Sequence, residues 1–472
     1  MRIRDVTFRC WKSHPGVRQS PAEMVLLKSI VGRLKSRAAT TPLTDQAEIG
    51  RLYSKWRVRI LYATTGGYAV FYFVRNNLSI ATPAITKEFA ISNTAWGAML
   101  GASGLVYGIS KFSSGLLADA LNPRFLLPVG LFLSALANVF FGFGKGMGYF
   151  TVLWMLNSVF SGVGVPPCAR LLKHWFGPRE IGRAWGVWNS SHQIGSAIIV
   201  VVAGFLVAHY GWRSAFLVPA AVAIAASFWL HNRLADSPES LGLPSIEDHQ
   251  ARSEPGAGGA ERGRTDIAGC WDMFRRRILT NKGVWIVSIA NFFVYVVRIG
   301  IVNWSPKYLT EAKHLTLASA SVCVLSFEIA GMFGAFASGW LSDSVFKGRR
   351  GPVSAGFMFV LIGLVLALFR VTNGDALTLG LIFAGLGFFV YGPQMLVAVA
   401  ATDFSTKEAS ASAVGLTGLL GYLGVTFCGP ATGILVDKFG WGAALWLYAA
   451  SAAIGFVLLA TTWNRKANLA ET

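Results

Sequence analysis

Two arginines lie deep inside long apolar segments of the chain, where a charged side chain is costly. Arg75 ends the tetrapeptide Tyr72-Phe-Val-Arg75 and Arg298 ends Tyr295-Val-Val-Arg298, at an offset of 298 − 75 = 223 in the numbering. A guanidinium in a bilayer core costs at least ~2.5–3.5 kcal/mol on insertion scales, so such a charge is a candidate functional residue. Two of them at equivalent points of a repeat predict one shared site that holds an anion.

Phosphate is the anion that two arginines suit best. The planar guanidinium binds phosphate or carboxylate through two parallel hydrogen bonds. A phosphate monoester carries about −1.5 to −2 charges at pH 7, which matches two guanidinium groups better than one carboxylate does. The alternative is a structural role, in which each arginine snorkels or pairs with a buried acid. Glu328 is the one mid-span carboxylate in the sequence, and it cannot neutralise both arginines.

Other polar side chains also fall inside apolar segments. His192 lies in the polar run Trp188-Asn-Ser-Ser-His192-Gln, and its imidazole can take up a proton near neutral pH as an anion arrives. Lys111 lies about two turns from a span end, so its side chain could either serve the site or extend to the membrane surface. We expect a functional or charge-balancing role for Glu328. Phenol groups that can donate to sugar or phosphate oxygens are expected, beside ordinary packing, at Tyr68, Tyr72, Tyr107, Tyr295, Tyr391 and Tyr422.

The elements that must position these residues are membrane-spanning helices. The 472-residue chain is 53% hydrophobic and only 14% charged, with a mean hydropathy of +0.50, whereas soluble domains are about 25% charged. A span needs about 20 apolar residues to cross a ~30 Å hydrocarbon core. Twelve such runs are predicted: 57–81, 95–118, 124–144, 149–173, 182–208, 213–232, 283–309, 317–341, 352–372, 376–401, 408–435 and 441–463.

The two halves of the chain repeat each other. Gly204-Phe-Leu-Val-Ala-His-Tyr-Gly-Trp212 matches Gly433-Ile-Leu-Val-Asp-Lys-Phe-Gly-Trp441, an offset of 441 − 212 = 229, and Pro167 matches Pro393, an offset of 393 − 167 = 226. Parallel repeats related by an axis along the membrane normal are the arrangement of the major facilitator fold, with the binding site between them. We therefore predict an all-α membrane protein of twelve transmembrane helices in two pseudo-symmetric six-helix bundles.

The pattern of predicted spans divides the chain into five parts. A basic cytoplasmic segment (1–56) precedes the first bundle (57–234), a flexible cytoplasmic linker (235–282) leads to the second bundle (283–463), and a cytoplasmic tail (464–472) ends the chain. Met24 opens an apolar stretch and is a candidate translation start, which N-terminal sequencing that found Met1 or Arg2 would refute. No cleavable signal peptide is expected.

A third repeated motif lies at the ends of spans. Gly115-Leu-Leu-Ala-Asp119 precedes Asn122-Pro-Arg124, and Gly339-Trp-Leu-Ser-Asp343 precedes Lys347-Gly-Arg-Arg350, at an offset of 343 − 119 = 224. Both resemble the major facilitator signature between helices 2 and 3 and between helices 8 and 9. Because these residues lie at span ends, we expect a structural or gating role for Asp119, Arg124, Asp343 and Arg349.

The net charge of +19 is distributed unevenly, which argues against nucleic-acid binding. Basic residues concentrate in alternate loops, and the positive-inside rule then places both termini in the cytoplasm. The five cysteines show neither paired nor metal-ligand spacing. We expect no disulfide, no metal and no cofactor.

Several stretches resemble the organophosphate:phosphate antiporter family, over residues 44–465. They are Tyr68-Ala-Val-Phe-Tyr-Phe-Val-Arg-Asn-Asn77, Tyr107-Gly-Ile-Ser-Lys-Phe112, Pro166-Pro-Cys-Ala-Arg170, Trp188-Asn-Ser-Ser-His192, Val294-Tyr-Val-Val-Arg-Ile-Gly-Ile-Val-Asn-Trp304, Tyr391-Gly-Pro-Gln-Met-Leu396 and Gly418-Leu-Leu-Gly-Tyr-Leu-Gly424. The resemblance implies that Arg75 and Arg298 hold the phosphate and that His192 assists binding. It also implies that Lys111 and the six tyrosines line or gate the cavity, and that Glu328 matches the family glutamate.

Departures from the family leave the substrate open. Asn76 replaces a lysine found in many relatives, and Asn303 replaces an aspartate of the glycerol-3-phosphate member. The resemblance is strongest to the hexose-phosphate sensor branch, through Leu43–Arg51 and the Cys168 stretch. The favoured interpretation is a monomeric antiporter of the bacterial inner membrane that exchanges hexose 6-phosphate, or next glycerol 3-phosphate, for inorganic phosphate.

Three other functions compete with this interpretation. A receptor that signals through a membrane histidine kinase needs the same arginines. A proton-coupled symporter or drug exporter usually has a titratable carboxylate in the cavity, and the first span has none. An enzyme is disfavoured because the sequence has no phosphate-cradling Gly-x-x-x-x-Gly-Lys loop, metal cluster or soluble catalytic domain.

Overall fold

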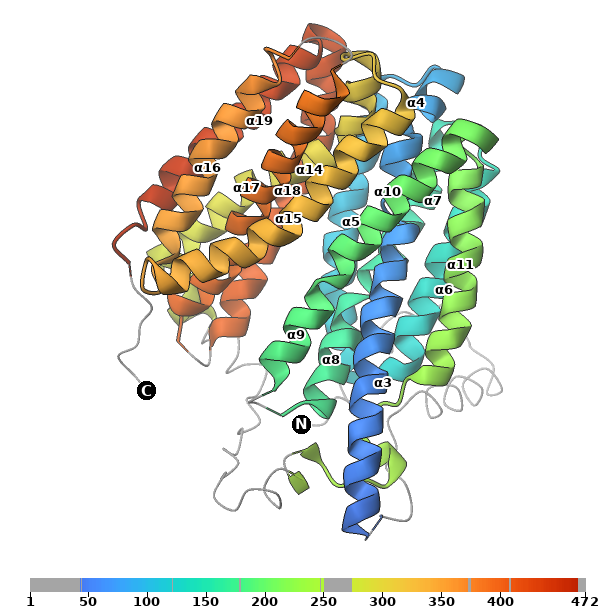
Figure 1. The fold of residues 1–472 in the computed structure, drawn as a ribbon, viewed down its shortest axis with the longest axis vertical. Coiled ribbons are helices and arrows are strands. Elements are labelled where there is room, and N and C mark those ends of the chain that lie inside the picture. The colour runs from blue at the N-terminus through green and yellow to red at the C-terminus, as the bar shows by residue number, and fades with distance from the viewer. Residues whose placement is uncertain are drawn as a thin grey trace, which may run out of the picture.

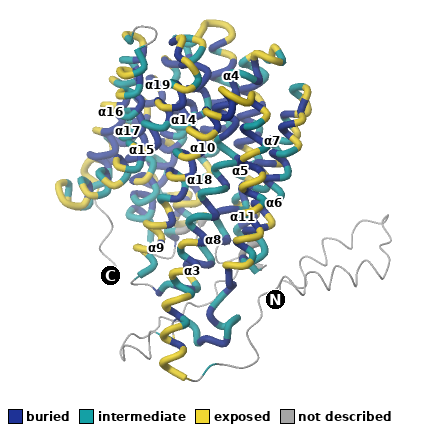
Figure 2. Tube along the Cα trace, turned by 45° about the vertical axis from the view of Figure 1, so that its right-hand side comes forward, coloured by how far each residue is buried: buried dark blue, intermediate teal, exposed yellow. Residues whose placement is uncertain are grey.

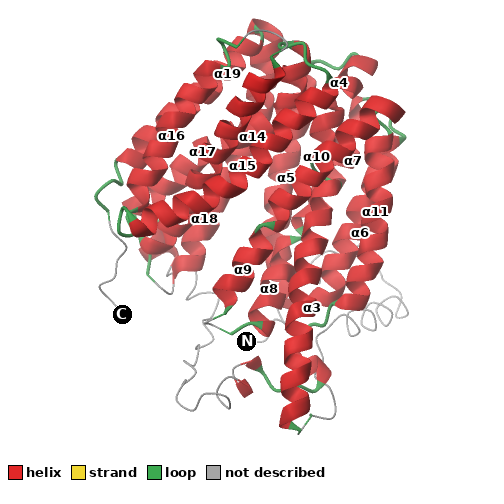
Figure 3. Ribbon diagram, viewed as in Figure 1, coloured by secondary structure: helices red, strands yellow, loops and turns green. Residues whose placement is uncertain are grey.

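The computed structural model describes residues 43, 45–120, 122–177, 180–246, 248–249, 274–371, 375–406 and 409–465, without the side chains of 116–120, 274 and 411. Over these residues the regular structure is helical (Figure 3). The candidate start Met24, most of the expected N-terminal segment, residues 250–273 of the expected linker and residues 466–472 of the tail lie outside the described residues.

The helices form two bundles, drawn in blue to green and in yellow to red (Figure 1). The first contains α3 (Gln46–Phe73), α4 (Asn77–Glu88), α5 (Asn93–Ala120), α6 (Pro123–Gly142), α7 (Met147–Gly162), α8 (Val165–Trp175), α9 (Ile181–Asn189), α10 (Ser191–Tyr210) and α11 (Ser214–Arg233). The second contains α14 (Lys282–Glu311), α15 (Leu317–Ser344), α16 (Arg350–Ala367), α17 (Ala376–Asp403), α18 (Ser410–Phe439) and α19 (Trp441–Ala460). Two short helical turns, Pro238–Leu241 and Phe274–Ile278, lie between the bundles in the sequence.

The predicted spans follow the helices in order, and three spans each contain two helices: α3 with α4, α7 with α8, and α9 with α10. In the described part of the chain, ten helices are long and apolar enough to cross a membrane. The remaining two predicted spans, 57–81 and 95–118, correspond to α3 with α4 and to α5. The apolar part of α3 is short because its basic residues extend to Arg59 and the helix ends at Phe73. The twelve-span, two-bundle fold predicted from the sequence is confirmed.

Each bundle packs around its own apolar interior, and its outer surface is apolar as well. Large side chains such as Phe112, Leu377 and Trp340 are exposed on the outside, while buried residues gather inside the bundles (Figure 2). Extended apolar surface of this kind marks a face that contacts lipid or another apolar partner. The outside is suited to a bilayer. Because lipid tails are as apolar as these side chains, close packing and hydrogen bonds between helices, rather than the hydrophobic effect, hold each bundle together there.

The bundles meet closely where α5 packs on α18. A methyl group at Gly97 would overlap the carbonyl oxygen of Gly429, and one at Gly433 would overlap the carbonyl oxygen of Asn93. Glycine at these positions lets the two helix backbones approach each other directly. This contact joins the halves at the end of the molecule away from the start of α3 (Figure 1).

A carboxylate also stabilises the contact between α5 and α18. Asp437 on α18 accepts hydrogen bonds from the backbone N–H groups of Asn93 (3.1 Å) and Thr94 (2.6 Å), and from both side chains (2.8 and 2.7 Å). These residues begin α5, where free N–H groups and the helix dipole favour a negative charge. The repeat-related position is 437 − 229 = 208, which is Ala208 and has no carboxylate. The Asp437 contact is therefore an asymmetric latch between the halves.

The first part of the expected linker is packed against the first bundle. Leu234, Leu243 and Ile246 are buried in its core. The hydroxyl of Tyr53 on α3 donates to the carbonyl of Pro244, and the Trp175 indole donates to the carbonyl of Ala235. Residues 235–246 thus form a strap across the end of α3 and α8, which hydropathy did not indicate because the strap is short and partly polar.

Replacing Asp437 with alanine is expected to let the halves separate at the latched end. A helix N-cap contributes about 1–2 kcal/mol, which corresponds to an about 5–30-fold change in a population ratio. Spin labels at Lys87 and Lys438, both exposed, would report this as a longer distance in pulsed electron–electron resonance. Asp375→Ala is the control, because Asp375 caps α17 within one half. Identical distance distributions in the Asp437→Ala and parent proteins would contradict the latch.

Candidate functional site

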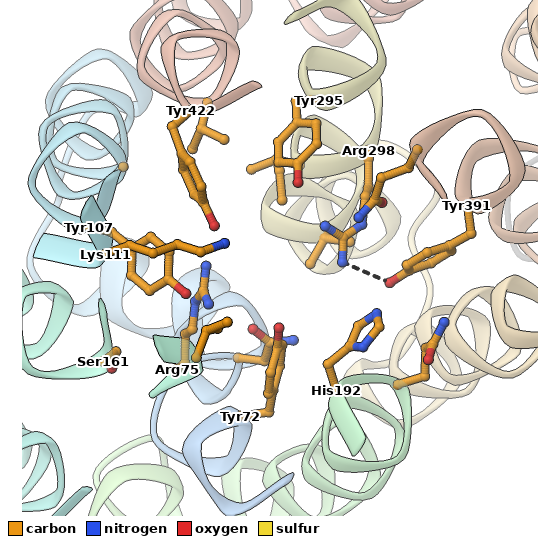
Figure 4. A pocket seen from close by; sticks show the side chains of 18 of the residues that line it. Tyr72, Arg75, Tyr107, Lys111, Ser161, His192, Tyr295, Arg298, Tyr391 and Tyr422 are labelled. Carbon is orange, nitrogen blue, oxygen red and sulfur yellow. Dashed lines mark hydrogen bonds between the residues drawn. The ribbon is translucent and has the colours of Figure 1, made fainter. Parts of the chain in front are cut away.

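A cavity of about 660 Å³ lies between the two bundles. Its lining comes from α3, α4, α5, α7, α8, α9 and α10 of the first half and from α14, α15, α17 and α18 of the second. Twelve residues singled out from the sequence all line it: Tyr68, Tyr72, Arg75, Tyr107, Lys111, His192, Tyr295, Arg298, Asn303, Glu328, Tyr391 and Tyr422. In the described part of the chain, the fold thus brings residues from eleven helices to one chamber. Figure 4 shows many of their side chains directed into it.

The chamber opens toward the end of the molecule where α3 begins. Trp185 on α9 and Met395 on α17 both line it, and they are 39% and 43% exposed. Figure 1 shows α9 near this end, apart from the second bundle. At the opposite end, α5 and α18 close the chamber through their glycine contact and the Asp437 latch.

Arg75 lies at an interruption of the first span. Helix α3 ends at Phe73 and α4 starts at Asn77, so Arg75 sits in the three-residue break between them. Its guanidinium carbon lies 4.0 Å from the ring centroid of Tyr107 and 5.6 Å from that of Tyr72. Aromatic faces attract a cation through their quadrupole. Arg75 is thus held by π faces, which leave its N–H groups available to an anion.

Arg298 has a different environment, on the uninterrupted helix α14. Its terminal N–H group donates to the hydroxyl of Tyr391 (3.0 Å), and that hydroxyl donates to the carboxylate of Glu328 (2.7 Å). Glu328 is only 1% exposed. The Nε of Arg298 is buried and has no hydrogen-bond partner. The Tyr391 hydroxyl therefore forms a hydrogen-bonded relay between the guanidinium of Arg298 and the carboxylate of Glu328. Among the described residues, the Nε–H of Arg298 remains without an acceptor.

The charges lining the chamber do not balance. Arg75, Lys111 and Arg298 are cationic, and Glu328 is the sole acidic residue in the lining. Three positive charges and one negative charge leave a net charge of +2 when His192 is neutral. Among the described residues, none of these three cations makes a salt bridge. Buried charges normally require a partner, so the chamber is suited to a dianion.

His192 lies between the halves. Its Nδ1 contacts the carbonyl of Asn189, at the junction of α9 and α10. The imidazole ring lies 6.0 Å from the ring of Tyr72 and 6.2 Å from that of Tyr391. Because Nδ1 is occupied by a carbonyl acceptor, Nε2 is the nitrogen left for a ligand. Figure 4 shows the ring directed toward the space below Arg298.

The tyrosines form two layers. Tyr107 packs on Tyr422 (5.1 Å between ring centroids) and Tyr422 on Tyr295 (5.9 Å), joining the halves across the chamber. Tyr68 lies behind Tyr72, stacked on Trp188 at 4.9 Å. Lys111 points its ammonium group toward the Tyr422 ring, 5.3 Å away. An aromatic wall of this kind presents ring faces and hydroxyl groups to the chamber.

Several lining residues were not identified from the sequence. Asn157, Ser158 and Ser161 line the chamber from α7, and Ser103 and Gln394 line it from α5 and α17. Asn157 and Ser161 are four residues apart and so share one helix face. Polar residues at this spacing inside the apolar run 149–173 were the signal that could have indicated them.

Of the expected gating residues, Arg124, Asp343 and Arg349 are not among the described residues that line the chamber. Asp343 pairs with Arg350, the residue after the expected Arg349, and Arg350 also contacts Asp403 at 3.1 Å. The geometric reason is that Arg350 begins α16 and so faces the ends of α15 and α17. Arg124 lies 3.4 Å from the carbonyl oxygen of His231. The side chain of Asp119 lies outside the described residues.

The Tyr391→Phe change is expected to destabilise the protein. It leaves the Glu328 carboxylate and Arg298 without a buried hydrogen-bond partner, a loss of about 1–3 kcal/mol. Tyr149→Phe is the control: this exposed tyrosine makes one long hydrogen bond, to the carbonyl of Phe140 (3.3 Å), and its loss should stay within about 0.5 kcal/mol. Thermal melting of the purified proteins in one detergent measures both. Equal melting temperatures for the two variants would contradict the relay.

Comparisons with known proteins agree with this architecture. Residues 64–426 match the Major Facilitator Superfamily. The chain is 38% identical over 433 residues to the "probable hexose phosphate transport protein" of Chlamydia pneumoniae, covering 89% of this chain and 94% of that protein. It is 34% identical over 432 residues to the membrane sensor protein UhpC of Escherichia coli, strain K12 (90% and 96%). It is 35% identical over 429 residues to the glycerol-3-phosphate transporter of Bacillus subtilis, strain 168 (89% and 95%).

A solved structure shares the fold. A bacterial homolog of the human lysosomal transporter Spinster, in an inward-facing and unoccupied conformation, superposes with a TM-score of 0.70. Its identity is 15%, and the match covers 86% of this chain and 98% of that one. The relatives are transport and sensor proteins rather than enzymes. The chain is a multi-pass membrane protein that belongs to the Major Facilitator Superfamily and, within it, to the organophosphate:phosphate antiporter group.

Proposed function

We propose that the protein exchanges an external sugar phosphate for internal inorganic phosphate across the bacterial inner membrane. Hexose 6-phosphate is the favoured substrate and glycerol 3-phosphate the next. The observation that carries the proposal is the chamber with a net charge of +2, to which each half contributes one arginine. A phosphate dianion supplies the missing negative charge, and two guanidinium groups match its oxygens bidentately.

Exchange follows from the placement of the arginines on opposite halves. Without an anion, closing the halves would bring Arg75 and Arg298 toward each other in a buried space of low dielectric, which is unfavourable. A bound phosphate removes this repulsion by contacting both. The two bundles therefore rock around the site, by alternating access, only when an organophosphate or inorganic phosphate is bound. This requirement couples the inward flux of organophosphate to the outward flux of inorganic phosphate.

Supporting roles are assigned to other chamber residues. His192 offers Nε2 to the phosphate, and Lys111 adds a third positive charge near Tyr422. Glu328 sets the position of Tyr391 and, through it, of Arg298. The tyrosines and Asn303 line the space for the sugar. Asp119, Arg124, Asp343 and Arg349 are assigned to gating or to stabilising the helix ends, as proposed from their motif.

The size and lining of the chamber favour a hexose. A volume of about 660 Å³ has room for a sugar ring beside the phosphate, and neutral donors such as Ser103, Ser158 and Gln394 face it. The relative from Chlamydia pneumoniae is named for hexose phosphate. With the basic loops on the cytoplasmic side, both termini are cytoplasmic and the open end of the chamber faces the cytoplasm.

A sensor is the second candidate. The relative from Escherichia coli is named a membrane sensor protein, and such a protein would bind the sugar phosphate and signal to a membrane histidine kinase. Binding chemistry would be the same in both cases. The difference is whether bound substrate crosses the membrane.

The test is uptake of labelled glucose 6-phosphate into proteoliposomes that contain the purified monomer. We expect uptake into vesicles loaded with inorganic phosphate and none into unloaded vesicles. Uptake into both would refute obligatory exchange. Binding of glucose 6-phosphate by calorimetry without any uptake would favour the sensor, and the absence of binding would refute the proposed substrate.

Arg75→Lys and Arg298→Lys should each lower the affinity for inorganic phosphate by at least about tenfold. Lysine keeps the charge but loses the bidentate fork, and a hydrogen bond to a charged group contributes about 1.5–3 kcal/mol. Calorimetric titration of the purified variants measures the affinity. Arg213→Lys is the control, since Arg213 pairs with Glu88 at the surface. Parent-like phosphate affinity in Arg75→Lys would overturn the assignment of this arginine.

A further inference from the structure

The break between α3 and α4, which contains Arg75, is hydrogen-bonded to two other helices through one backbone carbonyl, that of Val74. The backbone N–H groups of Arg75 and Asn76 both bond to the carbonyl of Tyr72, at 3.3 and 2.9 Å, and the chain turns here. The carbonyl oxygen of Val74 accepts side-chain N–H bonds from Asn138 on α6 and Asn157 on α7, each 2.9 Å long. A helix interruption frees backbone groups that need partners inside a membrane, and these two amides supply them.

The two asparagines belong to a larger buried network. Asn77 donates to the side-chain oxygen of Asn138 (3.0 Å) and to the carbonyl of Ala215 on α11 (2.9 Å). Ser134 donates to the side-chain oxygen of Asn157. Asn138 is 0% and Asn157 is 2% exposed. Four helices, α4, α6, α7 and α11, are thus joined by polar side chains directly behind the Arg75 break.

The second half of the chain serves as an internal control. At the offset that relates Pro167 to Pro393, Asn138 corresponds to Leu364 and Asn157 to Phe383, and α14 continues without a break from Lys282 to Glu311. A six-span bundle of the same design therefore forms with apolar residues at both positions. Burying polar groups is costly unless they are bonded. The network is present in the half that has a broken helix and is replaced by apolar residues in the half that has none.

We propose that Asn138 and Asn157 are positioning residues for Arg75. Their two N–H bonds to the Val74 carbonyl hold the α3–α4 break in one conformation, and this conformation determines the depth and direction of the guanidinium. Asn138 does not belong to the chamber lining, so it acts on a bound anion only through Arg75. The inference rests on the proposed function insofar as Arg75 binds phosphate.

Asn138→Leu is the test variant, because leucine is similar in size and lacks the amide. The change removes one of the two N–H groups bonded to the Val74 carbonyl and the side-chain oxygen that accepts from Asn77. Because the break is then held less firmly in one conformation, we expect an about tenfold loss of affinity for inorganic phosphate in calorimetry, which corresponds to about 1.4 kcal/mol. Asn291→Leu is the matched control. Asn291 is a buried asparagine on unbroken α14, outside the chamber lining, whose amide donates to the carbonyl of Thr417. It should change the phosphate affinity less than about twofold.

A second measurement reports on the conformation of the break between α3 and α4, whatever Arg75 binds. In a cysteine-free background, Ser79→Cys on α4 and Val302→Cys on α14 both place a thiol in the chamber lining. Asn138→Leu should change the rate of labelling by a charged thiol reagent at position 79 by at least about threefold and leave the rate at 302 unchanged. A purely structural role would lower the melting temperature and leave both the phosphate affinity and the labelling ratio unaltered.

The possible outcomes distinguish the positioning role of Asn138 and Asn157 from the proposal that Arg75 binds phosphate. Unchanged phosphate affinity together with an unchanged labelling ratio in Asn138→Leu overturns the positioning role, and so does an equal loss of affinity in Asn291→Leu. A changed labelling ratio, combined with parent-like phosphate binding in Arg75→Lys, overturns the phosphate assignment and leaves the positioning role in place. If Asn138→Leu does not fold, Asn157→Leu carries the labelling test, because Asn157 supplies the second N–H group to the same carbonyl. Its phosphate affinity is not used as evidence, because Asn157 itself lines the chamber.

Discussion

The burial of two guanidinium charges between apolar bundles is the constraint on which the rest of the structure depends. Neither charge is neutralised by a salt bridge among the described residues, and an unpaired charge in a low-dielectric interior is strongly unfavourable. The protein responds by surrounding the arginines with aromatic faces, by leaving a chamber open to one end, and by placing one arginine on each half. Each of these features lowers the cost of the buried charge.

The duplicated tetrapeptides are positioned by two different structures. Arg298 lies on a continuous helix and is partly compensated through Tyr391 and Glu328. Arg75 lies at a break and is held by Tyr107 and by the amides behind Val74. The two arginines are thus equivalent in sequence but not in electrostatic environment. The first half offers the less compensated charge, and the second half offers a charge already oriented by hydrogen bonds.

The two ends of the molecule also differ. At the end closed by α5 and α18, hydrogen bonds cross between the halves through Asp437. At the other end, the ion pairs of Arg57 with Glu180 and of Arg350 with Asp343 and Asp403 each stay within one half. Bonds within a half keep each bundle rigid, whereas the bonds between halves would have to break in the alternating access that we propose. This distribution suits rocking of two rigid bodies about the central site.

Hydropathy, repeat spacing and charge placement by themselves determined the spans and the two-bundle fold, because each is written in local sequence or in a constant offset between the halves. Twelve residues of the chamber wall were expected from the sequence and the family resemblance, whereas polar residues such as Asn157, Ser161 and Gln394 were not. Arg75 and Arg298 stand out in the sequence because a charge in an apolar run has a high energetic cost wherever the run folds. The tertiary structure alone decided the break at Arg75, the amides that hold it, the partner of Asp343 and the packing of residues 235–246. These features depend on contacts between segments far apart in the chain, such as Val74 with Asn138 and Asn157, and the spacing along one helix does not encode which carbonyl a buried amide meets on another.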